Sequence, residues 1–274
     1  MKKIRKLIIY IVLFLLGATF VYPLLWMVNM SLKTTEEIYQ SPFALPKKIV
    51  WENYPLALEE FDFLTFFGNS LLYAVVSVFF MLLFGSMLAY FLARIETKLN
   101  KVIMNYIVMG MVIPSSVTII PLYMIMNAIH LKNTRMGLIL VYTSSGIAGV
   151  TIMLYAFLRS LPRELEEASM IDGCSIYGTF FRIIIPCIKP ALCTRLIIDF
   201  MSVWNDYFVA YILTNSNRLK TIQVGIRSFF VNIGTYQWGK IGAAMVVTCA
   251  PVLIIYFIFS EQIENALTAG AVLK

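Results

Sequence analysis

The residues of this chain that are best able to do chemistry gather in one stretch, residues 159–190. It holds four acids and four bases between long hydrophobic segments: Glu164, Glu166, Glu167, Asp172, Arg159, Arg163, Arg182 and Lys189. Burying unpaired charges is costly, so a segment this polar must lie in water or against another protein. We call it the elbow, because its local signals describe two short helices joined at a glycine.

The first helix of the elbow is expected to start at Pro162, whose missing N–H is one of the donors left unpaired there in any case. Acidic residues follow in its first turns, where the helix dipole favours negative charge. Gly173 is placed to end this helix in a left-handed conformation, and Ser175 can cap a second helix. Three apolar residues of that second helix are predicted to share one face: Ile176, Phe180 and Ile183. Pro186 and Pro190 close the unit.

The composition places the segments around the elbow in a membrane. Hydrophobic residues make up 60% of the 274 residues and charged residues only 14%, with a mean hydropathy of +0.81. Soluble domains usually carry about 25% charged residues. A bilayer is spanned by roughly 20 mostly apolar residues, a length that this chain offers several times. We therefore predict an all-α polytopic membrane protein in contact with the lipid bilayer.

The formal charge of +7 does not indicate a nucleic-acid partner. The basic residues are scattered through the loops rather than gathered on one helix or patch, which fits membrane orientation better. The cysteines show no metal-ligand spacing and are expected to be free thiols: Cys174, Cys187, Cys193 and Cys249.

Six transmembrane helices are predicted, at residues 7–30, 63–93, 102–129, 136–158, 191–213 and 241–260. The basic N-terminus beside the first of them places both chain ends in the cytoplasm. Pro114 and Pro121 interrupt the third span, which is tolerated where neighbouring helices or a cavity satisfy the freed backbone groups. We divide the chain into an N-terminal helix with an external segment that lacks clear helical periodicity (1–62), a core of five helices that contains the elbow (63–260), and a cytoplasmic tail (261–274).

The sequence does not favour a catalytic, metal-binding or nucleotide-binding site. His130 is the single histidine, and no serine or metal-ligand cluster accompanies it. Residues 234–240, GTYQWGK, have the spacing of a phosphate loop. However, Ile241 stands where the magnesium-binding Ser or Thr is needed, and no strand precedes the segment. If the protein depends on ATP, another chain must bind it.

Polar residues near the fifth predicted span suggest a solute passage. Asp199 and Asp206 lie in or near the membrane, where ionised groups usually face a cavity or a partner. Arg195 stands four residues before Asp199 and is placed to pair with it. Aromatic faces, amides and carboxylates suit the C–H faces and hydroxyls of a sugar. The candidate lining residues are Ser145, Trp204, Asn205, Asp206 and Tyr207.

The same residues allow a plainer interpretation. Asp206 would then lie at the outer water interface, with Trp204 and Tyr207 in the aromatic belt of the membrane. Residues 143–146, which include Ser145, would form a small-residue surface for helix packing. The residues alone leave both alternatives open.

The elbow sequence EEASMIDGCSIYGTFFRIIIPCIKP resembles the cytoplasmic EAA loop of the permease subunits of ABC importers. Glu167 and Ala168 match its Glu-Ala-Ala, Ser169 replaces the second alanine, and Gly173 and the two closing prolines fall at the expected offsets. Other stretches are similar to the carbohydrate-importer branch, in particular to the smaller permease subunit of maltose importers: SLKTTEEIY at 31–39, ENY at 52–54, NSL at 69–71, LAYFLAR at 88–94, FMSVWNDY at 200–207 and LTAGAV at 267–272.

The resemblance implies a type I ABC importer permease fold and a mechanism. This subunit and a second, homologous permease subunit would form the pathway above two ABC ATPase subunits. ATP and Mg would be bound by the ATPase, so this chain would need no cofactor. An extracytoplasmic solute-binding protein would deliver a sugar to the outward-open state. The location implied is the cell membrane of a bacterium, its plasma or inner membrane.

The resemblance also implies roles within the elbow, which would dock in a cleft of one ATPase. Glu167 would present charge to the ATPase surface, Ala168 and Ser169 would allow close approach, and Gly173 would set the angle of the elbow. Asp172, inside the matching motif, belongs to the same docking set. Two other classes stay open: an ion-coupled secondary transporter, which the lack of an internal repeat disfavours, and a membrane scaffold protein that transports nothing.

Overall fold

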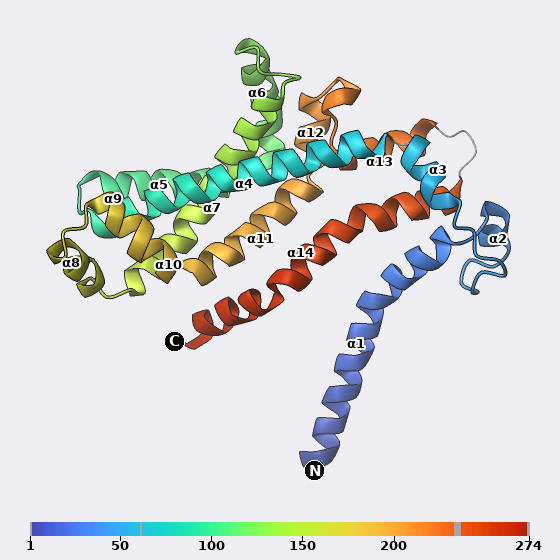
Figure 1. The fold of residues 1–274 in the computed structure, drawn as a ribbon, viewed down its shortest axis with the longest axis horizontal. Helices are drawn as coiled ribbons and strands as arrows, with labels where there is room; N and C mark the ends of the chain where they lie inside the picture. The colour runs from blue at the N-terminus through green and yellow to red at the C-terminus, as the bar shows by residue number, and fades with distance from the viewer. Residues whose placement is uncertain (1, 61, 233–236, 273–274) are drawn as a thin grey trace. The chain divides into compact units, whose positions relative to one another are not determined.

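The computed structural model describes residues 2–60, 62–232 and 237–272 (Figure 1). These residues form helices joined by turns and loops, with no strand among them, so the all-α prediction is confirmed for the part described. The chain forms two compact units, Met1–Phe67 with Val224–Pro251 and Gly68–Gln223 with Val252–Lys274. The three-part division proposed from the sequence follows membrane topology and stays a prediction.

The first unit is built around the end of α1 (Lys2–Ser31). It includes α2 (Thr35–Gln40) and α3 (Asn53–Glu60), as well as most of α13 (Ile222–Asn232) and the first part of α14 (Trp238–Val272). The two short helices correct the sequence interpretation, which found no clear helical periodicity in the external segment, and α13 lies between the fifth and sixth predicted spans. Local capping explains α2, since the Thr34 hydroxyl accepts a hydrogen bond from the Glu37 N–H at 3.2 Å.

A buried lysine and a buried asparagine hold the segment after α1 in place. Lys33 is fully buried, and its ammonium group donates hydrogen bonds to the carbonyl oxygens of Ser41, at 2.9 Å, and of Ala44. The Asn53 amide donates to the carbonyl oxygens of Ser31 and Lys33, at 2.8 and 2.9 Å. The stretches SLKTTEEIY and ENY therefore have a structural role, because they satisfy backbone groups that would otherwise be buried unpaired.

A substitution at Gly239 of α14 tests the packing around Lys33 and Asn53. A Cβ atom at Gly239 would meet the backbone oxygen of Lys33 and the side-chain amide of Asn53. Gly239→Ala is expected to lower the thermal midpoint of the purified protein by several degrees, because the backbone must shift. The measurement is loss of the monodisperse gel-filtration peak on heating.

Gly17→Ala is the matched control, since a Cβ there meets nothing within 4 Å. Alanine favours a helix over glycine by about 1 kcal/mol, so this control should keep or raise the midpoint. Equal midpoints for Gly239→Ala and the parent protein would contradict the packing described.

The second unit carries the rest of the helices. In chain order they are α4 (Phe63–Arg94), α5 (Leu99–Val112), α6 (Ser115–Ala128), α7 (Arg135–Ser160), α8 (Glu164–Ile171), α9 (Ile176–Thr179), a π-helix η1 (Phe180–Ile184), α10 (Ile185–Cys187), α11 (Lys189–Asn205), α12 (Phe208–Leu213) and a 3₁₀ turn η2 (Asn217–Leu219).

Small residues bring α4 and α7 close together. A Cβ at Gly85 would meet the side chain of Val150, and one at Gly146 would meet the sulfur of Met81. The Thr151 hydroxyl also donates to the Gly85 carbonyl oxygen at 3.4 Å. Glycines at a helix interface allow the backbones to approach, which is the usual packing mode inside membranes.

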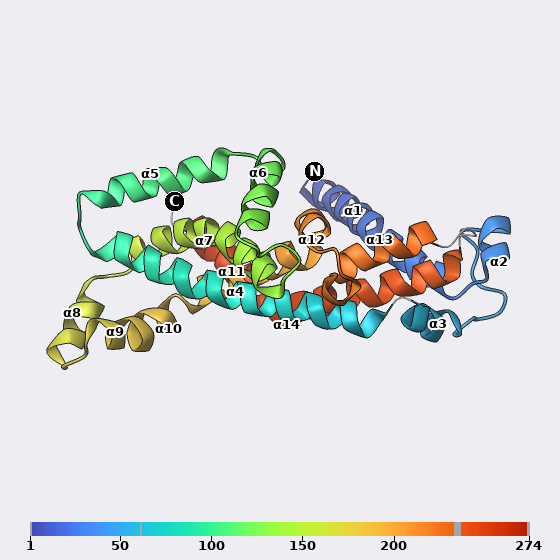
Figure 2. The same cartoon turned by 90° about the horizontal axis from the view of Figure 1, so that it is seen from above.

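Four described helices are long and apolar enough to cross a membrane: Ile4–Ser31, Phe63–Arg94, Arg135–Ser160 and Trp238–Ile258. They correspond to the first, second, fourth and sixth predicted spans. The third predicted span is not one continuous helix, because α5 and α6 are bent by 103° at the break between them (Figures 1 and 2). Pro114 causes the break, since a proline restricts the preceding residue to an extended backbone and Ile113 has φ −74° and ψ 118°. Pro121, in contrast, stays inside α6.

The fifth predicted span is also divided. α11 ends at Asn205, Asp206 has an extended backbone, and α12 begins at Phe208. α11 has 17 residues and carries Arg195 and Asp199, so it is shorter and more polar than the four clear spans. Six spans with both ends in the cytoplasm therefore stay a prediction.

Candidate functional site

The elbow contains the two helices and the glycine joint predicted for it. Its first helix, α8, begins at Glu164, two residues after Pro162, and carries acidic residues in its first turn. Gly173 has φ +83°, so the predicted left-handed ending is confirmed. The N–H groups of Gly173 and Cys174 donate to the carbonyl oxygens of Met170 and Ser169, both at 3.0 Å. This pairing satisfies the last carbonyls of α8 and fixes the direction of the chain beyond it.

The second helix of the elbow departs from the predicted spacing. The Ser175 hydroxyl caps it as expected, accepting from the Gly178 N–H at 3.2 Å. The π-helix η1 follows, and its wider turns move the apolar side chains around the axis. Consequently Ile176 is exposed and Ile183 half-buried. The buried face consists instead of Phe180, Ile184 and Ile188.

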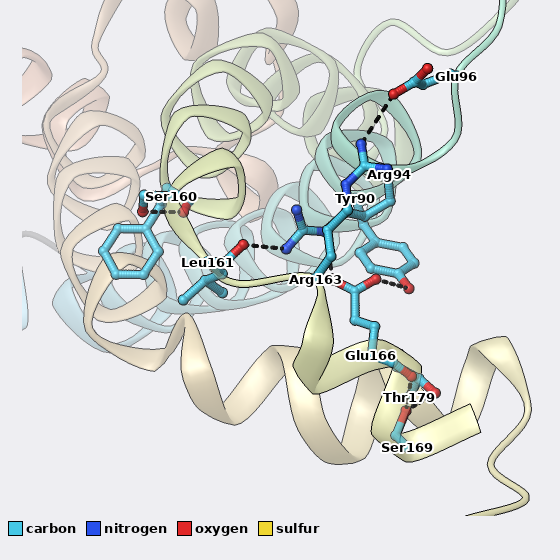
Figure 3. A network of polar contacts seen from close by, with 10 residues as sticks. Tyr90, Arg94, Glu96, Ser160, Leu161, Arg163, Glu166, Ser169 and Thr179 are labelled. Carbon is cyan, nitrogen blue, oxygen red and sulfur yellow. Dashed lines mark hydrogen bonds and ion pairs between the residues drawn. The ribbon is translucent and has the colours of Figure 1, made fainter. Parts of the chain in front are cut away.

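A buried ion pair attaches the elbow to the end of α4 (Figure 3). The Arg94 guanidinium donates from Nε to Glu166 Oε1 at 2.5 Å, and the Tyr90 hydroxyl donates to Glu166 Oε2 at 3.0 Å. Arg94 Nη2 also donates to the carbonyl oxygen of Leu161 at 3.1 Å. The side chains of the pair are each 8% exposed. We call Tyr90, Arg94 and Glu166 the clamp.

Two further contacts join the second elbow helix to the clamp and to α8. The Tyr90 ring packs against the Phe180 ring, with centroids 5.2 Å apart. The hydroxyls of Ser169 and Thr179 lie 2.7 Å apart, and both side chains are buried. Both halves of the elbow are therefore held to the end of α4.

The docking residues proposed from the sequence divide into two groups. Glu167, Ala168, Asp172 and Gly173 lie on the exposed side of the elbow. Ser169 is buried, and its hydroxyl supports the elbow from within. Sequence reasoning missed the role of Glu166. A signal was present, because Tyr90 and Arg94 stand four residues apart in LAYFLAR and so share a helix face.

An exposed ion pair at the same end of the molecule offers a matched comparison for the clamp. Arg163 Nη2 lies 3.1 Å from Glu96 Oε1, with side chains that are 54% and 84% exposed (Figure 3). Removing one partner of a buried pair costs about 3–5 kcal/mol. An exposed pair contributes about 0–1 kcal/mol.

We expect Glu166→Ala to accelerate hydrogen exchange of the α8 backbone amides by at least about 100-fold, whereas Glu96→Ala should change it less than about fivefold. The double variant Arg94→Ala with Glu166→Ala should exchange more slowly than Glu166→Ala alone, because no unpaired charge remains buried. Mass spectrometry of the exchanged peptides makes the measurement. Equal effects of the Glu166 and Glu96 substitutions would show that the clamp does not hold the elbow.

The second candidate region is a cavity of about 490 Å³ inside the helical bundle of the second unit. Helices α4, α5, α6, α7, α11 and α12 all contribute to its walls. Its polar lining residues are Ser115, Thr118, Tyr142, Ser145, Arg195, Asp199, Ser202 and Asp206. The volume lies within the range of about 300–1,000 Å³ that is usual for small-molecule sites.

The charged groups of the cavity are held by defined hydrogen bonds. Arg195 pairs with Asp199 as predicted, with Nε 3.2 Å from Oδ2 and a second, shorter contact from Nη2 to Oδ1. Gly149 makes room for the guanidinium, since a Cβ there would lie 2.8 Å from Arg195 Nη2. Asp206 Oδ2 accepts from the Tyr142 hydroxyl at 2.7 Å and from a backbone N–H of α12 at 3.0 Å.

The cavity contains two of the five pathway residues proposed from the sequence. Ser145 and Asp206 line it. Trp204 is buried and stacks on Phe200 with ring centroids 5.6 Å apart, and Tyr207 stacks on Tyr211 at 5.3 Å. Asn205 is exposed, and none of these last three is among the lining residues.

Sequence reasoning expected Asp199 and Asp206 to face a cavity or a partner but missed Arg195 and Ser202 as parts of the cavity wall. Arg195, Asp199 and Ser202 are spaced by four and three residues, which places them on one face of α11, and Asp206 follows four residues later at the C-cap of that helix. The small-residue segment 143–146 serves both interpretations given for it: Gly146 packs against Met81, while Ser145 and Gly146 line the cavity.

Two other sequence observations concern the phosphate-loop-like segment and the cysteines. Residues 234–236 of the phosphate-loop-like segment lie outside the described residues, and α14 begins at Trp238. The four cysteines are free thiols.

The family of the chain follows from comparison with known proteins. Residues 81–268 match the family described as binding-protein-dependent transport system inner membrane component. The chain belongs to this family, and the resemblance of its elbow to a permease EAA loop agrees with that membership.

Individual relatives are similar over most of their length. The diacetylchitobiose uptake system permease protein NgcG of Streptomyces coelicolor is 32% identical, over 91% of this chain and 83% of that protein. The sulfoquinovosyl glycerol transport system permease protein SmoH of Agrobacterium fabrum is 34% identical, over 91% and 87%. The melibiose/raffinose/stachyose import permease protein MelC of Bacillus subtilis is 31% identical, over 91% and 90%.

Solved structures share the fold. One chain of a bacterial ABC transporter involved in the import of the acidic polysaccharide alginate superposes with a TM-score of 0.86 at 24% identity, over 94% of this chain and 96% of that chain. A second structure, of a bacterial alginate ABC transporter with a periplasmic protein that carries an alginate pentasaccharide, gives a TM-score of 0.60 at 17% identity, over 89% and 92%. The chain therefore has the type I ABC permease fold.

Proposed function

We propose that this chain is one of two permease subunits of a bacterial ABC importer for a sugar, coupled by its elbow to a separate ATPase. The observation that carries the proposal is an exposed elbow surface on a rigid support: α8 presents acidic and apolar side chains outward, while the clamp fixes it to α4 from within. A loop without a partner would not need a buried ion pair to hold its position.

The exposed side of the elbow has the properties of a docking surface. Ile171 is 86% and Tyr177 72% exposed, and both lie near the acidic Glu167 and Asp172 in the chain. Large apolar side chains beside charges, held on a short rigid helix, are typical of protein interfaces. The proposed partner is one of two ABC ATPase subunits, which bind ATP and Mg, so that this chain takes part in transport without hydrolysing anything itself.

Exposed apolar surfaces of α1 and α5 are available for contact with a second permease subunit. α5 has no buried residue in this chain, and the long apolar stretch of α1 is exposed to the surroundings as well. A homologous subunit and lipid would cover these surfaces in a membrane. We assign α11 and α12 together to the remaining span, which gives six spans with both termini in the cytoplasm of the cell.

The solute proposal rests on the relatives and on the cavity. Two of the relatives named above import oligosaccharides by their names, diacetylchitobiose in one case and melibiose, raffinose or stachyose in the other. The cavity offers hydroxyl and carboxylate groups beside apolar walls, which suits a sugar. A solute-binding protein outside the membrane would deliver it.

Gentle purification of the tagged protein from its host tests the assembly. An ABC ATPase and a second permease are expected to co-purify in amounts comparable to the tagged chain. Recovery of the tagged chain alone, with solute uptake that follows an ion gradient and needs no ATP, would identify an ion-coupled secondary transporter instead. Recovery alone with no uptake would identify a scaffold protein.

Glu167→Lys and Ile171→Asp test the elbow surface. Each is expected to reduce the co-purified ATPase and the solute-stimulated ATP hydrolysis at least about tenfold, because a reversed charge or a buried carboxylate at an interface costs several kcal/mol. Leu45→Asp is the matched control, since Leu45 is 82% exposed but lies in the proposed external segment. Normal association of the ATPase with both elbow variants would contradict the docking assignment.

A further inference from the structure

The cavity in the second unit carries an unequal number of acids and bases. Among its described lining residues one is basic, Arg195, and two are acidic, Asp199 and Asp206. The effect on a solute depends on which of these charges is already neutralised inside the protein.

The charge of Arg195 is neutralised by Asp199. The guanidinium and the carboxylate form a two-point contact on one helix face, and both side chains are largely buried. Gly149 lets the guanidinium lie directly against α7, so its position is also fixed sterically. Because the planar guanidinium and the carboxylate contact each other at two points, little of either charge remains available to a solute.

Asp206 lines the cavity, and none of the described salt bridges pairs it with a base. Its carboxylate accepts from the Tyr142 hydroxyl and the Ala210 N–H, and more weakly from the Val209 N–H at 3.5 Å. These donors are neutral groups, so they do not cancel the charge of the carboxylate. The cavity wall contributed by this chain therefore carries one net negative charge.

We propose that this half of the pathway selects neutral or cationic saccharides and disfavours anionic ones. The inference rests on the proposed function. A single charge about 8 Å away, at an effective dielectric constant of about 20, changes the occupancy of a unit charge roughly 30-fold. Neutral hydroxyl-rich sugars avoid this penalty and find hydrogen-bonding side chains in Ser145, Ser202 and Thr118.

The proposed preference for uncharged or cationic sugars differs from what is expected for the alginate transporter whose fold this chain shares. That transporter is involved in the import of an acidic polysaccharide, alginate. Uronic acid units would bring a carboxylate against Asp206 with the only lining base, among the described residues, already paired. Of the relatives named above, the diacetylchitobiose system handles an uncharged sugar of the kind that the cavity fits, whereas the sulfoquinovosyl glycerol system handles a sulfonated one that this cavity would disfavour.

Charged thiol reagents test the proposal without knowledge of the natural solute. Ser202→Cys places a thiol on the cavity wall of the complete transporter in nanodiscs. It is treated with a cationic (trimethylammonium) or an anionic (sulfonate) methanethiosulfonate of similar size. The rate at residue 202 is read by mass spectrometry of its peptide, so the native thiols need no replacement. Each rate is divided by the rate of the same reagent with a small free thiol.

The corrected rate is expected to be at least about tenfold higher for the cationic reagent. Adding Asp206→Asn should lower that ratio to below about threefold. Adding Tyr142→Phe should keep the ratio high, because it removes a hydrogen bond but not the charge. Glu96→Gln, which removes an exposed charge outside the cavity lining, should leave it unchanged.

Nucleotide dependence separates this proposal from the proposed function. If the reaction at residue 202 changes between the resting and the vanadate-trapped transporter while the two reagents react equally, the pathway assignment stands and charge selection is wrong. If the rate at residue 202 is the same in both states, the cavity is not on the pathway and both proposals fail. A partner binding protein that prefers a uronate or sulfonated sugar over a neutral one would also overturn charge selection.

Discussion

The position of the elbow depends on the burial of one ion pair. Two charges taken out of water each lose several kcal/mol of hydration, which a close contact and additional hydrogen bonds must offset. Glu166 and Arg94 meet this requirement only when Tyr90 and the carbonyl oxygen of Leu161 are in place. The pair therefore contributes less to stability in general than to specificity, because any other position of α8 would leave a buried charge unpaired.

The same two helices connect the clamp with the cavity. Met81 and Arg94 lie on α4, about 20 Å apart along the helix axis; Met81 lines the cavity and Arg94 holds the elbow. α7 runs alongside this connection, from the cavity residue Ser145 to its C-cap residue Leu161, whose carbonyl oxygen accepts a hydrogen bond from Arg94. Glycine contacts between α4 and α7 prevent one helix from sliding freely along the other. In the proposed importer, a displacement of the elbow by an ATPase would thus reach the cavity wall directly.

Features set by neighbouring residues could be predicted from the sequence. The left-handed Gly173, the Ser175 cap and the Arg195–Asp199 pair follow from local stereochemistry or from i,i+4 spacing, and all are confirmed. Features set by distant residues could not. The choice of Glu166 over Glu167 for the buried position depends on α4, which stands more than seventy residues earlier in the chain. The π-helix after Thr179 and the size of the bend at Pro114 likewise depend on packing that no local pattern contains.

The formal charge of the whole sequence does not predict the charge of the cavity wall. The chain has a formal charge of +7, yet its cavity wall has more acids than bases. Of the three described salt bridges, two are substantially buried, and each cancels one base with one acid inside the protein. In the proposed pathway, the charge that a solute would meet is that of Asp206, whose partners donate hydrogen bonds but carry no positive charge. The overall basic charge is therefore no guide to the proposed selection of a solute, which would depend on the individual charges that are left unneutralised in the cavity wall.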